Sequence, residues 1–121
     1  MSMRTLLDRL DDFSQRANVR YALQPDNPAL LFNYLQHNRM LADSHACRRM
    51  KRRLHRQAVR LLLDTLCDNC IDLHWRHLCL DQIHQPLLAL QKLARSDHER
   101  RQDSHLLCEL RLLSHYFLSG T

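Results

Sequence analysis

Residues 29–85 contain neither glycine nor proline and read ALLFNYLQHNRMLADSHACRRMKRRLHRQAVRLLLDTLCDNCIDLHWRHLCLDQIHQ. As one continuous helix this stretch would be about 85 Å long at 1.5 Å per residue. A domain of this size has a radius of gyration of only roughly 14 Å. The stretch must therefore hold several helices. We expect the first break at Asp43-Ser44, because both residue types cap helices, and a second break between Asp68 and Asp81.

The composition of the whole chain also indicates an all-α protein. Leucine occurs 26 times among 121 residues, against two valines and two isoleucines, and the chain has one glycine and three prolines. β-Sandwiches and barrels need β-branched strands and frequent glycine-rich turns, so both classes are close to excluded. We predict a compact all-α bundle of four to six helices that forms a single domain over residues 1–121.

Apolar spacing predicts a helix before this stretch and marks the start of the next one. A helix from about residue 3 to 17 would carry one apolar stripe, since its apolar residues recur at spacings of three and four. Asn27 is expected to cap the following helix and Pro28 to take its first position. The stripe of the first helix consists of Met3, Leu6, Leu7, Leu10, Phe13 and Ala17.

Two further signals follow the stretch. Pro86 is expected to start or kink a helix that carries a group of leucines. Ser96 and Glu99 have the spacing of a capping box, which predicts a last helix over residues 97–118 that Gly120 ends. Adjacent leucine pairs place apolar groups on neighbouring helix faces, so the bundle has either doubly buried helices or an apolar surface for a partner. A homodimer is the simplest cover for such a surface.

The net charge of +5 comes from one segment. Residues 1–43 sum to zero and residues 61–121 sum to −2, whereas residues 44–60 carry seven basic side chains and no acid. On a helix, Met50, Leu54, Ala58 and Leu61 form a narrow apolar strip, and the basic residues occupy the rest as an outward-facing cationic ridge. The basic side chains are Arg48, Arg49, Lys51, Arg52, Arg53, Arg56 and Arg60.

Like charges at spacings of three and four repel, so the counter-charge for this ridge must come from elsewhere in the fold or from a ligand. Three interpretations stay open. The ridge is a solvated face that pairs with the acidic C-terminal half, a phosphate-contacting surface for DNA or RNA, or a docking surface for an acidic protein or an anionic membrane.

We expect a small cytoplasmic regulatory protein that is not an enzyme and binds nucleic acid through the helix 48–60. The alternative is a helical adaptor, chaperone or inhibitor that docks an acidic or apolar partner surface. No segment resembles a membrane span or a secretory signal, and the odd count of five cysteines favours a reducing compartment. No phosphate-cradling glycine loop or grouped catalytic set is visible.

Cysteine and histidine gather in one region, at Cys67, Cys70, His74 and His77. These residue types are the ligands that Zn²⁺ prefers. Their spacings of three, four and three place them along one helical stripe, where an unbroken helix supplies only two ligands to one ion. A break at Asp68-Asn69, or a second pair at His105 and Cys108, would complete a zinc site. The favoured hypothesis is that these residues are structural, on or beside a buried face, with no metal and no cofactor.

Overall fold

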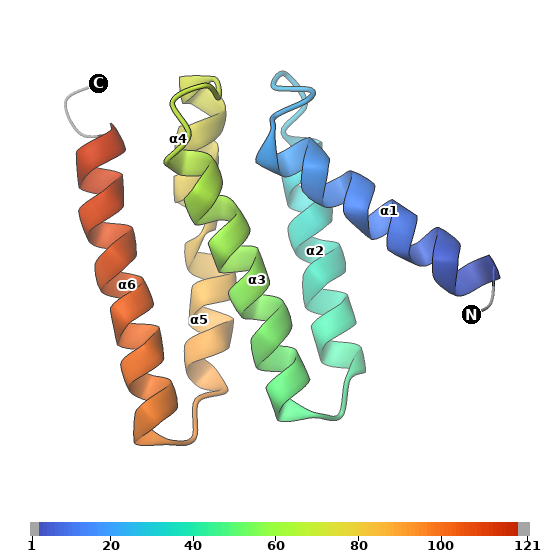
Figure 1. The fold of residues 1–121 in the computed structure, drawn as a ribbon, viewed down its shortest axis with the longest axis vertical. Helices are drawn as coiled ribbons and strands as arrows, with labels where there is room; N and C mark the ends of the chain where they lie inside the picture. The colour runs from blue at the N-terminus through green and yellow to red at the C-terminus, as the bar shows by residue number, and fades with distance from the viewer. Residues whose placement is uncertain (1–2, 119–121) are drawn as a thin grey trace.

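The computed structural model describes residues 3–118, including their side chains except those of residues 4, 5, 7 and 8. Within these residues the chain forms six helices and no strand, which confirms the predicted all-α bundle. Figure 1 shows α2, α3, α5 and α6 running alongside one another, α4 above α5, and α1 diverging from the others. The helices are α1 (Met3–Arg20), α2 (Ala29–Ser44), α3 (Arg48–Leu66), α4 (Leu73–Gln82), α5 (His84–Lys92) and α6 (Asp97–Leu118).

The central element is α3, which contacts each of the other five helices. Its buried face is centred on Val59, Leu62 and Leu66, all without solvent exposure. These residues join side chains from every other helix in one hydrophobic cluster. Because burial of apolar area is the main stabilising term in folding, the position of α3 determines which of its side chains remain available to solvent.

The predicted apolar strip of this helix is only partly correct. Ala58 and Leu61 are buried, but Met50 and Leu54 are half-buried. The helix is rotated so that its most buried face also contains Arg52 and His55. The reason is that α3 is surrounded, and a surrounded helix buries more than one narrow strip.

Both predicted breaks in the glycine-free stretch are present. The helix α2 ends at Ser44, whose hydroxyl donates to the Leu41 carbonyl at 2.6 Å. The second break covers residues 67–72, and the Asp72 carboxylate then accepts from the His74 backbone N–H at 2.9 Å. Aspartate at this position caps α4 in the usual way. The chain therefore turns at polar capping residues where glycine is absent.

The expectations for Pro86 and for the Asn27 cap have different outcomes. Pro86 lies in the first turn of α5, and Ile83 separates α5 from α4. Proline has no N–H to donate to the Gln82 carbonyl four residues earlier and its ring crowds that carbonyl, which explains the junction. The predicted cap at Asn27 is wrong, because α2 starts at Ala29 after Pro28, without a side-chain cap, and the Asn27 amide donates to Gln24 instead.

The apolar stripe of α1 is largely exposed. Met3 is 71% and Phe13 72% exposed, and Leu6 and Leu10 are exposed as well. Among the described side chains of α1, the buried core residue is Val19, near the C-terminal end of the helix. Figure 1 shows why: the N-terminal part of α1 points away from the other helices. The adjacent leucines of other helices show both expected outcomes, since Leu61, Leu62 and Leu63 are all buried whereas Leu88 and Leu112 are exposed.

The end of α1 lies three residues beyond the predicted one and uses alanine where glycine is usual. Ala22 has a φ of 48°. The Leu23 N–H donates to the Asn18 carbonyl at 3.2 Å and the Ala22 N–H donates to the Val19 carbonyl at 3.3 Å. This is the bonding of a Schellman motif, whose left-handed position normally takes glycine. The missing glycine explains why the sequence gives no clear end for this helix.

The N-terminus of α6 is held by a modified capping box. The Glu99 N–H donates to the Ser96 hydroxyl at 3.1 Å, as predicted, whereas the Glu99 carboxylate accepts from the Arg95 N–H at 3.0 Å and not from that of Ser96. The predicted stop at Gly120 lies outside the described residues.

The other end of α6 lies beside the end of α3. The buried Arg76 guanidinium donates to the Leu66 carbonyl at 2.9 Å and to the Phe117 carbonyl at 3.4 Å. It also donates to the Asn69 side chain at 3.3 Å. The last carbonyls of a helix carry partial negative charge, so this one cation satisfies the C-terminal ends of two helices. None of the described helices combines the length and the apolarity needed to cross a bilayer.

Candidate functional site

Six arginines of α3 fall into two groups, one with carboxylate partners on α6 and one without, and Arg52 of the first group lies in the interior. Arg52 is only 2% exposed. Its two terminal nitrogens bind the two Asp103 oxygens at 3.0 Å each, and its Nε lies 3.1 Å from the Glu99 carboxylate. Its Nη1 also donates to the Leu90 carbonyl at 2.8 Å. The expectation that this residue faces outward is wrong, because its position on α3 turns toward α5 and α6.

Arg48 and Arg60 also have carboxylate partners on α6. Arg48 Nη1 donates to Glu99 at 2.8 Å and to the Leu93 carbonyl at 3.0 Å. The Arg95 N–H and the Arg48 guanidinium lower the pKa of Glu99 to about 2. Arg60 binds Glu109 at 2.9 Å, and both side chains remain nearly half exposed. The acidic C-terminal half thus supplies part of the counter-charge, as one of the three interpretations expected.

The other group consists of Arg49, Arg53 and Arg56. They recur at spacings of four and three, so they form one row on the exposed face of α3. Within the described residues none of the three has a carboxylate partner, and the one hydrogen bond of this row runs from Arg56 to Gln102 at 3.4 Å. We call these three side chains the arginine row. Lys51 is half-buried on another face, also without a described ion pair.

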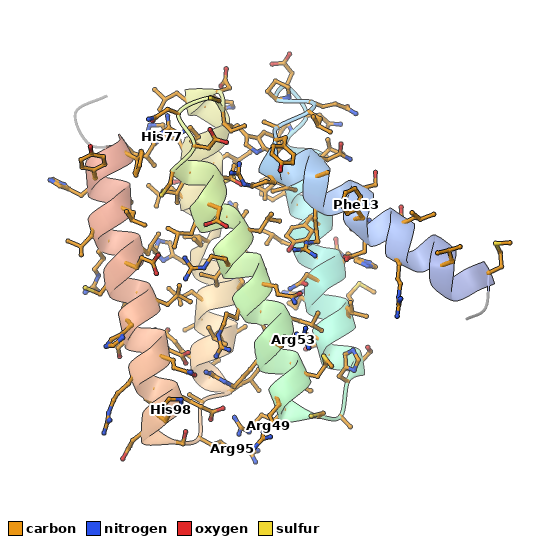
Figure 2. All side chains as sticks on the ribbon, viewed as in Figure 1. Phe13, Arg49, Arg53, His77, Arg95 and His98 are labelled. Atoms are coloured by element: carbon orange, nitrogen blue, oxygen red, sulfur yellow. The ribbon has the colours of Figure 1, made fainter. Side chains whose placement is uncertain are left out.

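The arginine row borders a hollow at one end of the bundle. Both α3 and α6 begin at this end (Figure 1), so two helix N-termini with positive partial charge lie there. The hollow has a volume of about 500 Å³ between the two helices. Figure 2 shows Arg49, Arg95 and His98 around this end, with Arg53 above them on α3. The hollow between α3 and α6 is lined by Arg48, Arg49, Arg52, Arg56, Ser96, His98, Glu99 and Gln102.

A second hollow of about 350 Å³ continues the basic surface toward α1. Arg53, Arg56 and Arg60 line it from α3, and Arg16 lines it from α1. Arg56 therefore belongs to both hollows. From Arg49 to Arg60 the exposed face of α3 covers about 16 Å at 1.5 Å per residue. Together the two hollows form one basic surface with a single acid, Glu99 or Asp64, in each.

The cysteines and histidines do not assemble as a site. Cys67 ends α3 and is half-buried, Cys70 lies in the turn and is exposed, and His74 and His77 follow on α4. Among the side chains that the structure describes, no three of His, Cys, Asp or Glu are placed to hold one metal ion. His105 and Cys108 are both exposed on α6. The expectation that the cluster is buried is wrong for Cys70 and His74.

A different cysteine is the buried one. Cys79 has no exposure, and burial raises the pKa of its thiol to about 12. Cys47 is exposed at the start of α3, where backbone N–H groups of Met50 and Arg49 lower the pKa of its thiol. All five cysteines are unpaired.

The individual acidic partners of α3 were not predicted, although the sequence contains a signal for two of them. Arg48 and Arg52 are four residues apart, and so are Glu99 and Asp103. Two parallel helices with the same pitch bring such pairs into register. Equal spacing of opposite charges on two predicted helices is therefore the pattern that would have identified the buried arginine.

Comparisons with known proteins give no match: no family model fits the chain, and no curated protein or solved structure is significantly similar.

Proposed function

We propose that this protein is a small, non-enzymatic regulatory protein of the cytoplasm that binds the phosphate backbone of nucleic acid through the arginine row and its two hollows. The observation that supports this proposal is the absence of a carboxylate partner for Arg49, Arg53 and Arg56 within the described residues, although α6 pairs with three other arginines of the same helix. The α6 carboxylates neutralise one side of α3 and leave the row exposed.

The chemistry of the row suits phosphate. Arginine presents a planar fork that binds phosphate oxygens in a bidentate way, and one helix of such side chains tracks a backbone without reading bases. Base-reading amides near the row are limited to Gln57 and Gln102. We therefore expect affinity that depends strongly on salt and little on sequence. With Arg49, Arg53, Arg56 and Arg95 each meeting one phosphate, the slope of log K against log salt on duplex DNA would be about −3.6.

The test is a salt titration of binding, followed by fluorescence anisotropy of labelled duplex DNA, duplex RNA and single-stranded oligonucleotides. The variant R49Q/R53Q/R56Q removes the row. The control R100Q/R101Q/R111Q removes the same number of charges from exposed positions of α6 that line none of the described hollows. We expect the row variant to lower the salt slope by about 2.7 relative to wild type, and the control to change it by less than one third of that.

Two results contradict the proposal. One is the absence of binding by the wild-type protein at low salt. The other is an equal loss in both variants, which would show that net charge alone attracts the nucleic acid.

The exposed stripe of α1 favours a second candidate, a helical adaptor or inhibitor that docks an apolar partner surface. The four large exposed side chains Met3, Leu6, Leu10 and Phe13 share one helix face. A second copy of the chain would cover the same stripe in a homodimer. Binding through this stripe would change little with salt and would be lost in L10E/F13E, whereas the arginine-row variant would keep it. Sedimentation at several concentrations of both variants separates dimer from monomer.

A further inference from the structure

A hollow of about 280 Å³ lies between α2, α3 and α5, apart from the basic surface. Both α2 and α5 pack on α3, and His55 of α3 lines the space between them. On a helix with 3.6 residues per turn, His55 and Arg53 point about 160° apart, so this hollow opens on a different side of α3 from the arginine row. Its volume is near the lower end of the range for small-molecule sites, about 300–1,000 Å³.

The floor of this hollow has unused hydrogen-bonding capacity. His55 is 5% exposed and has no hydrogen-bond partner within the described residues. Beside it, the Asn38 amide donates to the Leu54 carbonyl at 3.2 Å, whereas its side-chain oxygen accepts no described hydrogen bond. Both side chains line the hollow, so this capacity is open to a molecule bound there. Burial lowers the pKa of His55, so at neutral pH the ring is neutral and offers one donor and one acceptor.

The walls and the rim differ from the floor. Leu35 and Pro86 are buried and give the hollow apolar walls. At the rim, Arg39 comes from α2 and Lys92 from α5, and both are exposed without a described carboxylate partner. The hollow is therefore lined by two exposed cations, by buried apolar side chains and by a buried, neutral imidazole.

We propose that this hollow binds a small carboxylate that has an apolar middle and a hydroxyl or keto group at its far end. The carboxylate lies between Arg39 and Lys92, the hydrocarbon packs against Leu35 and Pro86, and the far group exchanges hydrogen bonds with His55. Each part matches one kind of side chain that lines the hollow. Sites for small organic ligands typically have mostly apolar walls and a small number of polar groups that converge on the ligand.

Nuclear magnetic resonance titration tests the proposal with four probes: hexanoate with a terminal hydroxyl, hexanoate, hexanediol and acetate. We expect the hydroxyhexanoate to bind most tightly and to move the ring resonances of His55. Hexanoate lacks the far group, hexanediol lacks the carboxylate and acetate lacks the hydrocarbon. Each should therefore bind at least about threefold more weakly, which corresponds to a binding free energy weaker by roughly 0.7 kcal/mol.

The variants R39Q and K92Q change exposed residues, so the fold should persist, and the fluorescence of Trp75 checks this. Each substitution should weaken the binding of hydroxyhexanoate about threefold, a free-energy change within the range measured for exposed ion pairs. The control R111Q, on the exposed face of α6, should not. The proposal is overturned if hydroxyhexanoate leaves the His55 resonances unshifted, if hexanoate, hexanediol or acetate binds as tightly, or if all three variants behave alike. Nucleic-acid binding is independent of every one of these outcomes.

Discussion

Replacing either member of the buried Arg52–Asp103 pair should strongly destabilise the protein, whereas replacing both should not. In D103L the guanidinium of Arg52 loses two hydrogen bonds of 3.0 Å and keeps Glu99 and the Leu90 carbonyl. In R52M the Asp103 carboxylate, 4% exposed, loses its only described cation. Breaking one side of such a buried pair costs about 3–5 kcal/mol, out of a total stability of roughly 5–15 kcal/mol.

The double variant R52M/D103L removes both charges and leaves apolar side chains of comparable volume. Such replacements are often neutral or stabilising. The double variant leaves the Arg48–Glu99 pair in place. We therefore expect its free energy of unfolding to lie within about 1 kcal/mol of that of the wild type. The coupling energy between the two positions would then be at least about 5 kcal/mol if each single variant loses 3 kcal/mol.

Urea unfolding followed by Trp75 fluorescence measures these differences. Trp75 is the single tryptophan, has no solvent exposure and donates to the Val19 carbonyl at 2.9 Å. The control cycle uses Arg100 and Asp97, an exposed pair at 3.1 Å, which should contribute below about 1 kcal/mol. The reasoning is refuted if R52M and D103L each cost less than 1 kcal/mol, or if their effects simply add in the double variant.

Three further predictions concern stability and reactivity. A22G should raise the free energy of unfolding by about 0.5–1 kcal/mol, because glycine adopts the left-handed conformation without a side-chain clash; urea unfolding measures it. The pKa of Glu99 falls from 4.5 to about 2 on folding, so its contribution to stability is complete above pH 5 and disappears as the pH falls toward 2. The midpoint of thermal unfolding should therefore decrease across this pH range. The decrease should be smaller in E99Q, which lacks the carboxylate. A thiol reagent at neutral pH should modify Cys47 first and Cys79 last. The pKa of the Cys47 thiol is lowered at an exposed helix start, whereas burial raises the pKa of the Cys79 thiol. Mass spectrometry of the labelled peptides gives the order of modification.

The sequence predicted the helical class, the break after Ser44 and the extent of the last helix, because these depend on local properties. The leucine-rich composition excluded strands, and capping residues such as Ser44 and Asp72 mark breaks that glycine or proline would mark elsewhere. Ala22 shows the limit of local reasoning. Its left-handed conformation is held by the surrounding fold and has no sequence signature.

The candidate site was predicted less well, because burial of a charged residue is decided by partners distant in sequence. Arg52 and Arg53 are neighbours with the same side chain, yet one is buried and the other exposed. Counting charges within residues 44–60 treats them alike. The difference arises from Asp103 on a helix that begins about fifty residues later, and only a comparison of charge spacing between helices would reveal it.

The attachment of α6 at both ends by arginines has a consequence for how the molecule opens. At one end Arg48 and Arg52 hold its first turns, and at the other Arg76 holds Phe117. Fewer buried apolar side chains anchor α6 than anchor α3, so its amide protons should exchange with deuterium as one cooperative segment, ahead of those of α3. As the pH falls toward 2, protonation of Glu99 would loosen the first turns of α6 before the rest of the molecule.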